Sequence, residues 1–367
     1  MKIYQVFEEY SLFYQPYIPP VLKMLNTYEG FNCKVMAFKG KSESENHFIL
    51  PSYYHRLLKE KFNYILRPSL KPYNYLSQKA ILEKVDIIHL QHSFLFSKII
   101  PLLNLPTGQR PKVVITLRGG DTYIKPWIMN KWKNFYEIYG NKVDAFIAMS
   151  ENQKQYLQKW GVSQDKIFVI PISFGKRFNI VPKSPNQNKL KLVSVFRMCW
   201  EKNITGNFEF VRKMKEMSLP FAYDIYGDGH DIGQVYYLRD KFNLHNEVNI
   251  HGKVDNEILK NKLRDYDFIL QLSSSESLGM TVIEAQSLGL PAVISNSDGL
   301  PETIINNKTG LIVDKYNILS TVEKLYLIWS NKEIYEQYSF SAIENSHMKF
   351  SIENEVEKLH NLYKTLS

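Results

Sequence analysis

Short apolar runs alternate with longer amphipathic stretches along most of the chain. In the first half, strand-like runs occur at 85–91, 112–121, 144–150 and 166–171, and a helical stretch at 151–162 separates the last two. The runs are too short for helices and rich in β-branched residues. Strands that alternate with helices are typical of βαβ units, so the pattern predicts an α/β fold with a parallel sheet.

The same pattern restarts after a polar segment. Residues 179–190 contain two prolines and show no periodicity, which predicts a linker. The strands expected beyond it are 191–197, 221–229, 249–254, 267–273, 292–295 and 311–313, and a last helix is expected at 353–366. We therefore predict two α/β domains, over 1–178 and 191–349. Ligands of such sheets bind beyond the carboxyl ends of the strands.

Composition narrows the class of protein. The 367 residues are 44% hydrophobic and 23% charged, as in a soluble globular protein with more than one core. No apolar run reaches the ~18 residues of a membrane span, and the first residues lack a signal-peptide pattern. Cys33 and Cys199 have neither metal-binding nor CxxC spacing. These features predict a cytoplasmic location.

The net charge of +9 is unevenly distributed. Residues 1–180 hold 25 Lys/Arg and 13 Asp/Glu, a net +12, whereas 181–367 hold 21 and 24, a net −3. The segment 53–84 combines this basic charge with Tyr and Phe, which is typical of an interfacial contact with an anionic membrane. An ordinary helix with its aromatics packed inward is the alternative. No nucleic-acid-binding signature is present, so we expect no nucleic acid partner.

Two carboxylates stand out in "SESLGMTVIEAQSLGLPAV", residues 275–293. A helix should begin near Met280 or Thr281 and end before Gly289. Glu276 then lies in a loop at the carboxyl edge of the sheet, and Glu284 lies in the first turns of the helix. Taken singly, each has a plain explanation: solvent exposure for Glu276 and a favourable helix-dipole position for Glu284.

The pair and its flanks resemble the Glu-x7-Glu motif of retaining GT-B glycosyltransferases, family 4 (glycosyl transferases group 1). The resemblance continues through 289–313 and, more loosely, through "DIIH", "TLRGGD" and "DAFIAMSE" in the first half. It implies two Rossmann-like domains that face a cleft. The domain over 1–178 would bind the acceptor, the domain over 191–349 would bind a nucleotide-sugar donor, and a helix at about 350–367 would cross back to the first.

The resemblance also implies roles for single residues. Glu276 would contact donor-sugar hydroxyls and Glu284 the ribose, because a carboxylate can accept two hydroxyl hydrogen bonds. The segment Gly279, Met280 and Thr281 would present a helix N-terminus, where negative charge is favoured. The family commonly has glycine where this chain has Ser277.

A diphosphate needs positive charge, and "FRMCWEKN" (196–203) resembles the family's Arg-x4-Lys element. Arg197 and Lys202 would neutralise the leaving diphosphate. The glycines that the family usually has beside them are Phe196 and Asn203 here. In "HGKV" (251–254), Lys253 and Val254 occupy the position where members of the family hold the nucleotide base. The alternative to diphosphate binding is that Arg197 and Lys202 are a solvated pair at a strand end.

The first half matches the family less closely. "TLRGGD" ends a strand, so Arg118, Gly119 and Asp121 should lie at the acceptor edge, but Arg118 stands where the family often has histidine. Arginine cannot act as a general base at ordinary pH. His89 matches the family's Asp-x-x-His and is expected to be structural. Aromatics and prolines replace the family's glycine-rich loop at 8–20.

Metal and cofactor requirements follow from the same comparison. Asp265 and Asp267 form a DxD sequence, which binds Mg²⁺ in other glycosyltransferases. Here it precedes a strand and so lies at the wrong end of the sheet. We expect no metal site and no cofactor.

The resulting hypothesis is a metal-independent, retaining hexosyltransferase that uses a UDP- or GDP-sugar. Its acceptor would be a cell-envelope polysaccharide (lipopolysaccharide, capsule or exopolysaccharide) or a lipid-linked saccharide, met in the cytoplasm or at the inner face of the plasma membrane. The alternative is a degenerate, non-catalytic member that binds sugar nucleotides or supports a partner.

Overall fold

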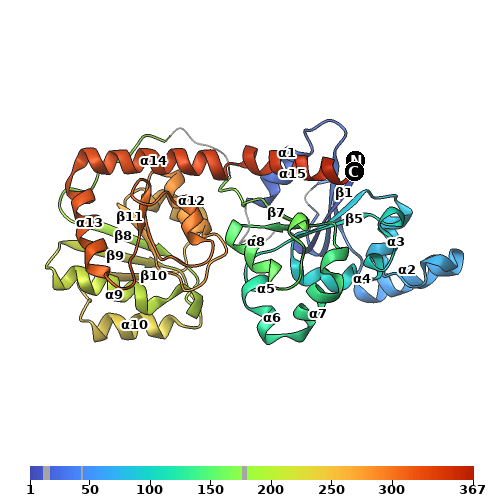
Figure 1. Ribbon diagram of the computed structural model, residues 1–367, viewed down its shortest axis with the longest axis horizontal. Helices are drawn as coiled ribbons and strands as arrows, with labels where there is room; N and C mark the ends of the chain where they lie inside the picture. The colour runs from blue at the N-terminus through green and yellow to red at the C-terminus, as the bar shows by residue number, and fades with distance from the viewer. Residues whose placement is uncertain (11–16, 43, 176–179) are drawn as a thin grey trace. The chain divides into compact units, whose positions relative to one another are not determined.

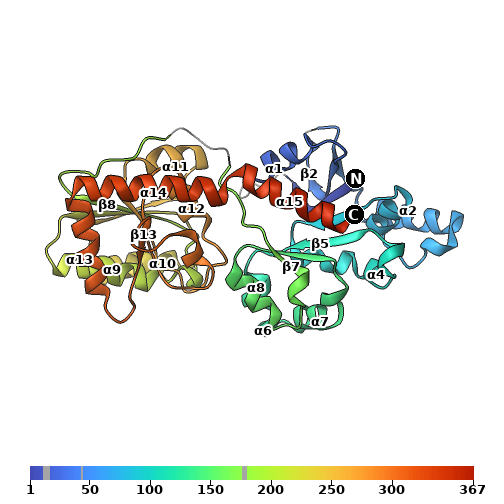
Figure 2. The ribbon, with the colours of Figure 1, turned by 45° about the horizontal axis from the view of Figure 1, so that its top comes forward.

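The computed structural model describes residues 1–10, 17–42, 44–175 and 180–367. The chain divides into two compact units: Met1–Gly175 with Ile352–Ser367, and Lys176–Ser351. Each unit contains one sheet whose paired strands are all parallel (Figures 1 and 2).

The first unit has a seven-stranded sheet in the order β3-β2-β1-β4-β5-β6-β7. Its strands are β1 (Lys2–Tyr10), β2 (Asn32–Gly40), β3 (His47–Ile49), β4 (Ile87–Leu90), β5 (Lys112–Thr116), β6 (Ala145–Ala148) and β7 (Ile167–Val169). Its helices are α1 (Ile18–Leu25), α2 (Tyr53–Leu66), α3 (Tyr75–Leu82), α4 (Ile100–Leu103), α5 (Gly120–Tyr123), α6 (Lys125–Ile128), α7 (Asn130–Tyr139), α8 (Glu151–Gln158) and α15 (Ile352–Leu366). Helices α3, α4, α7 and α8 share one core with the sheet, and α15 packs beside α1.

The second unit has a six-stranded sheet in the order β10-β9-β8-β11-β12-β13. Its strands are β8 (Leu190–Val195), β9 (Phe221–Tyr226), β10 (Val248–Gly252), β11 (Phe268–Gln271), β12 (Ala292–Ile294) and β13 (Gly310–Ile312). Its helices are α9 (Ile204–Glu216), α10 (Ile232–Lys241), α11 (Asn256–Leu263), α12 (Met280–Ser287), α13 (Ile318–Ser330) and α14 (Lys332–Phe350). Helices α9, α10 and α13 contribute to one core and α11 and α12 to another.

The predicted fold class, two Rossmann-like units with parallel sheets, is confirmed. All six strands expected beyond the linker are present, within three residues at each end. The predicted helix at 353–366 is α15, which belongs to the first unit. The central strand β1 carries a fully buried Gln5, whose amide donates to Tyr363 Oη at 2.9 Å. Of the loop expected at 8–20, residues 11–16 lie outside the described residues, while 8–10 end β1 and 18–20 begin α1.

The segment expected as a linker at 179–190 is held against the second unit over its described part. Lys183 N–H donates to Ser339 Oγ at 2.8 Å, and Asn186 N–H donates to Asp267 Oδ1 at 2.9 Å. Asp267 also accepts from Lys191 N–H at 2.8 Å, so it ties this segment to the start of β8. The Asp267 carboxylate therefore accepts backbone hydrogen bonds at the amino end of the sheet. This end is opposite the edge where ligands of such folds bind.

Candidate functional site

The corner between β11 and α12 has the geometry expected from the sequence. Glu276 lies in the loop, and Glu284 lies in the second turn of α12. Gly279 precedes the helix with a φ of +96°, a conformation that favours glycine. A Cβ there would lie 2.5 Å from Leu300 Cδ1, so the Leu300 side chain would have to shift to accommodate it.

The Glu276 carboxylate is the centre of a polar cluster. It forms an ion pair with Lys202 Nζ, and the Glu276 side chain is only 16% exposed. The Gln271 side-chain amide donates to the same carboxylate oxygen at 2.9 Å. The structure thus brings together two of the predicted residues, Glu276 and Lys202, which are 74 positions apart in the chain.

Gln271 was missed by sequence reasoning. Its carbonyl accepts from Thr281 Oγ1 at 2.6 Å, which fixes the amide so that its N–H group points to Glu276. Gln271 is the last residue of β11, whose other residues, Phe268, Ile269 and Leu270, are apolar, and it is buried. A buried amide in such a position needs partners, and that was the available signal.

The loop that carries Glu276 is also hydrogen-bonded to residues that follow β12. Asp298 accepts from Ser275 Oγ at 2.6 Å and from Glu276 N–H at 3.2 Å. Gly299 N–H donates to the Glu276 carbonyl at 2.9 Å. Ser277, the departure from the family pattern, is half-buried in this loop.

Lys202 ends a short 3₁₀ turn whose position depends on two asparagines. Asn203 has a φ of +46°, a left-handed conformation that asparagine tolerates, and its amide donates to the Leu272 carbonyl at 2.9 Å. Asn207 donates to the Lys202 carbonyl at 3.0 Å and accepts from Leu272 N–H at 3.2 Å. Asn203 therefore adopts a left-handed conformation at the position where the family usually has glycine.

Arg197 lies just beyond β8 at the same sheet edge. Backbone pairing continues past the strands: Phe196 N–H donates to the Tyr226 carbonyl at 3.1 Å and Met198 N–H to the Asp228 carbonyl at 2.9 Å. A Cβ on Gly227 would lie 1.9 Å from the Phe196 oxygen, so glycine is required there. The Arg197 side chain is exposed. Hydrogen bonding with Cys199, and then the charges of Glu201 and Glu276, raise the pKa of Arg197.

Glu284 has an unusual proton affinity. Burial raises the pKa of its carboxyl from 4.5 to about 7, and the charge of Lys260 on α11 opposes this shift. A carboxyl with this pKa is present at neutral pH in both protonation states, so it can accept or donate a hydrogen bond to a ligand hydroxyl.

Lys253 and Val254 follow the end of β10 at the same edge of the sheet. Gly252 ends the strand with a φ of +70°, and its carbonyl accepts from Gly227 N–H at 2.8 Å. Val254 packs against the core of α11 and α12, whereas Lys253 is exposed. The other predicted donor-side residues thus follow β8, β10 and β11, whereas Met280, Thr281 and Glu284 lie in α12.

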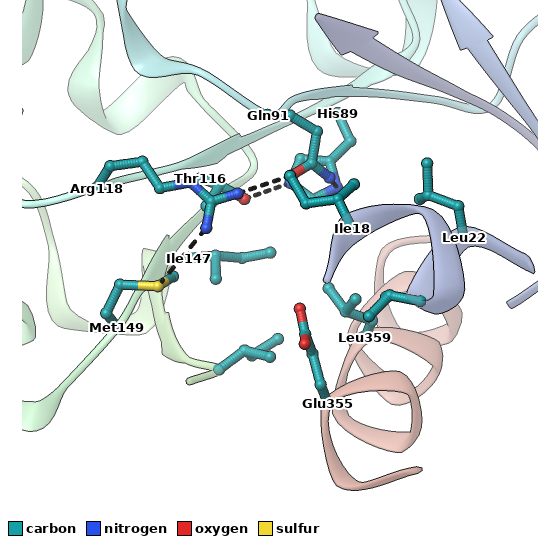
Figure 3. A pocket seen from close by; sticks show the side chains of 12 residues that line it. Ile18, Leu22, His89, Gln91, Thr116, Arg118, Ile147, Met149, Glu355 and Leu359 are labelled. Atoms are coloured by element: carbon teal, nitrogen blue, oxygen red, sulfur yellow. Dashed lines mark hydrogen bonds between the residues drawn. The ribbon is translucent and has the colours of Figure 1, made fainter. Parts of the chain in front are cut away.

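In the first unit, the predicted residues His89 and Arg118 line a small cavity of about 20 Å³ (Figure 3), whereas Gly119 and Asp121 are not among its lining residues. His89 is buried, with Nδ1 at 2.6 Å from Tyr363 Oη and Nε2 at 2.7 Å from Thr116 Oγ1. Burial, with the charge of Arg118, lowers the pKa of His89 to about 3. A neutral imidazole with both nitrogens engaged supports a structural role.

Asp121 and Gly119 shape the turn after β5. The buried Asp121 carboxylate accepts from Arg118 N–H at 2.9 Å, from Gly119 N–H at 3.0 Å and from Ser93 Oγ. Its oxygens are therefore used within the turn, which identifies Asp121 as a residue that organises the loop.

The Arg118 side chain contacts Gln91 Oε1 at 3.1 Å and lies 3.9 Å from Met149 Sδ (Figure 3). Glu355 of α15 faces the same cavity, and its carboxylate accepts from Ser173 N–H at 2.7 Å. Burial raises the pKa of Glu355, and the charge of Arg118 opposes the shift. The sequence analysis did not single out Gln91 or Glu355. Glu355 lies on α15, whose residues become neighbours of β4 and β5, and so of Gln91, only in the folded unit.

The two units with parallel sheets define a Rossmann-like protein. One unit has a paired lysine and glutamate and two glycine-dependent turns at the carboxyl edge of its sheet. Residues 176–344 match the family model "Glycosyl transferases group 1", and residues 26–172 match "Glycosyltransferase Family 4". The chain belongs to this family of GT-B glycosyltransferases, which confirms the resemblance seen in the sequence.

Similar proteins are known by sequence and by structure. A poly(ribitol-phosphate) alpha-N-acetylglucosaminyltransferase of Staphylococcus aureus is 24% identical over 361 residues, which is 96% of this chain and 66% of that relative. A glycosyltransferase of Rickettsia africae is 20% identical with a TM-score of 0.74, covering 100% of this chain and 98% of that one. HepE of Anabaena in complex with UDP is 14% identical with a TM-score of 0.73, covering 100% of both chains.

Proposed function

We propose that the protein is a retaining glycosyltransferase. It transfers a hexosyl group from a UDP-sugar to a cell-envelope polysaccharide or lipid-linked saccharide, without a metal ion or cofactor. We further propose that it acts in the cytoplasm, in peripheral contact with the inner face of the plasma membrane. The UDP complex of the structural neighbour HepE favours UDP over GDP, and the name of the S. aureus relative makes N-acetylglucosamine the first sugar to test.

The observation that carries the proposal is the Lys202–Glu276–Gln271 cluster, with Arg197 at the same edge. In the proposed donor complex, Lys202 and Arg197 contact the diphosphate, and Glu276 accepts hydrogen bonds from the sugar. A lysine ammonium has three donors, so Lys202 can keep its contact with Glu276 while it binds a phosphate oxygen. Glu284 holds the ribose, and Lys253 and Val254 lie beside the base.

The proposed chemistry breaks the bond between the anomeric carbon and the diphosphate oxygen. UDP leaves with the electron pair, and Arg197 and Lys202 stabilise the charge that develops on it. The acceptor hydroxyl attacks from the same face, and its proton passes to the departing phosphate. The acceptor is proposed to bind the first unit near Arg118 and Gly119.

A panel of UDP, GDP and their sugars, measured by thermal shift, tests the donor assignment without knowledge of the acceptor. Hydrolysis of the bound sugar nucleotide is then followed by NMR, which reports the anomeric configuration of the first-formed product. An inverted product would overturn the retaining assignment. Nucleotide binding without turnover of any sugar nucleotide would support the non-catalytic alternative.

A further inference from the structure

Helix α2 makes polar contacts with the rest of the first unit and leaves most of its apolar side chains in solvent. Asn63 Nδ2 donates to Gln78 Oε1 at 2.9 Å, and Glu60 Oε1 accepts from Tyr75 N–H at 2.7 Å. Arg56 donates to the Pro51 carbonyl at 2.6 Å. No residue within α2 is buried. Leu57 and Tyr64 are half-buried on the inner side of the helix with Glu60 and Asn63, but most of the apolar side chains of α2 lie in solvent rather than on a core.

The exposed side carries a continuous apolar stripe. Tyr54, Leu58, Phe62 and Ile65 are 77%, 64%, 62% and 70% exposed, and their spacing places them on one side of the helix. Tyr53 and Leu66 extend the exposed apolar surface at its two ends. An apolar surface that the protein leaves in water is typical of an interaction site.

The basic residues around the stripe favour an anionic partner. Between residues 53 and 71 there are five Lys/Arg and a single acidic residue, Glu60, which is engaged with the start of α3. The exposed basic residues are Lys59, Lys61, Arg67 and Lys71. A second copy of the chain would bring the same positive charge to the stripe, which disfavours self-association. Apolar residues bordered by lysine and arginine suit an anionic lipid surface.

The position of α2 leaves this stripe accessible. The helix follows β3, the edge strand of the first sheet, and projects from the first unit in both views (Figures 1 and 2). None of the described helices is long and apolar enough to cross a bilayer.

We infer that α2 lies in the surface of an anionic bilayer, with Leu58 and Phe62 among the acyl chains and Lys61 and Arg67 at the headgroups. This deepens the proposed function, because a surface-bound first unit would meet a lipid-linked acceptor. The inference itself rests on the exposed stripe and its charge and does not require the donor chemistry.

Vesicle sedimentation of the full chain tests the inference. Vesicles of phosphatidylcholine mixed with phosphatidylglycerol should bind the protein, vesicles of phosphatidylcholine alone should bind it weakly, and salt should release it. The double substitution Leu58→Asp and Phe62→Asp should lower the partition coefficient by about tenfold or more, since it removes two apolar groups that would insert into the bilayer and adds two negative charges. A matched control is Leu327→Asp on α13, which is 66% exposed and lies in the other unit.

The two variants separate the inference from the proposed function. Both should keep the wild-type melting temperature and the wild-type rate of UDP-sugar hydrolysis in the absence of lipid. Equal vesicle binding by wild type and the Leu58/Phe62 variant would overturn the inference, as would a wild-type dimer that the same variant dissociates. Vesicle binding by a protein that turns over no sugar nucleotide would keep the inference and reject the catalytic proposal.

Discussion

The side-chain amide of Gln271 donates to the Glu276 carboxylate at 2.9 Å. The amide cannot rotate without losing a second contact, because its carbonyl accepts from Thr281 Oγ1 at 2.6 Å. Glu276 is therefore held from two sides, by the charge of Lys202 and by an oriented neutral donor. This relationship links the end of β11, the loop and the start of α12 in one hydrogen-bonded chain.

Replacing Gln271 with leucine should impair turnover more than folding. A hydrogen bond to a charged group contributes roughly 1.5–3 kcal/mol, which corresponds to a loss of at least about tenfold in kcat if it orients Glu276 in the transition state. KM for the donor should change less, because the diphosphate contacts remain. Thr281→Val should shift kcat in the same direction by a smaller factor, since Gln271 stays but is less constrained.

A purely structural role for Gln271 would give a different result. Both variants would then lower the melting temperature in proportion to their loss of activity. Steady-state kinetics at saturating donor, with thermal unfolding of the same samples, distinguishes a role of Gln271 in turnover from a structural role.

Replacing Glu276, the partner of Lys202, should affect UDP binding and sugar transfer differently. Glu276→Gln removes a negative charge beside the proposed diphosphate site, so UDP should bind as tightly as to the wild type or more tightly. Transfer should nevertheless fall by about 100-fold, because the sugar loses its carboxylate. Lys202→Ala should weaken both.

Calorimetric titration with UDP and a coupled rate assay measure these two quantities. Lys262→Ala is a suitable control, because Lys262 is an exposed lysine in the last turn of α11, which precedes the start of β11 rather than its carboxyl end. A Glu276→Gln enzyme with wild-type turnover would remove Glu276 from the proposed mechanism.

Much of the second unit was predictable because its signals are local. The strands are short apolar runs, and the turn before α12 is marked by Gly279 and its stop by Gly289, whose φ is +84°. The sequence therefore placed Glu276 and Glu284 correctly in the loop and the helix. It did not indicate that Lys202 pairs with Glu276, since this contact joins two separate strand ends.

The unpredicted parts depend on contacts between distant segments. Asp298 is an ordinary polar residue in the sequence, 22 positions from Glu276, and only the fold brings the two together. Likewise, the described part of 179–190 looks like a linker by composition, but Asp267 and Ser339 supply its hydrogen bonds. The direction in which α2 packs was also open, because periodicity defines two sides of a helix but not which one faces the protein.

The raised pKa of Glu284 predicts a pH dependence of stability. The folded protein holds the proton up to about pH 7, whereas the unfolded chain releases it near 4.5, so the folded state binds more protons between these values. The stability contributed by this group is present at pH values below 4.5 and is lost as the pH rises through 7. Glu284→Gln should therefore raise the melting temperature above pH 7 and change it little near pH 4.

The same variant separates this effect from ligand binding. If Glu284 holds the ribose as a carboxylate, UDP affinity of the wild type should rise as the pH passes through about 7, and the variant should lack that rise. A pH-independent difference in melting temperature between the two proteins would contradict the assigned pKa.

Gly279 is expected to tolerate no side chain. In Gly279→Ala, the new Cβ would lie 2.5 Å from Leu300 Cδ1, and alanine would have to adopt a φ of +96°, which costs about 1–2 kcal/mol for a non-glycine residue. The melting temperature should fall by several degrees, and donor binding should weaken because α12 and Glu276 shift together. Gly233→Ala provides the matched control: Gly233 is in the first turn of α10, a Cβ there would meet nothing within 4 Å, and alanine favours the helix. Thermal unfolding of both variants tests the contrast, and equal melting temperatures would show that the loop can rearrange around a side chain at 279.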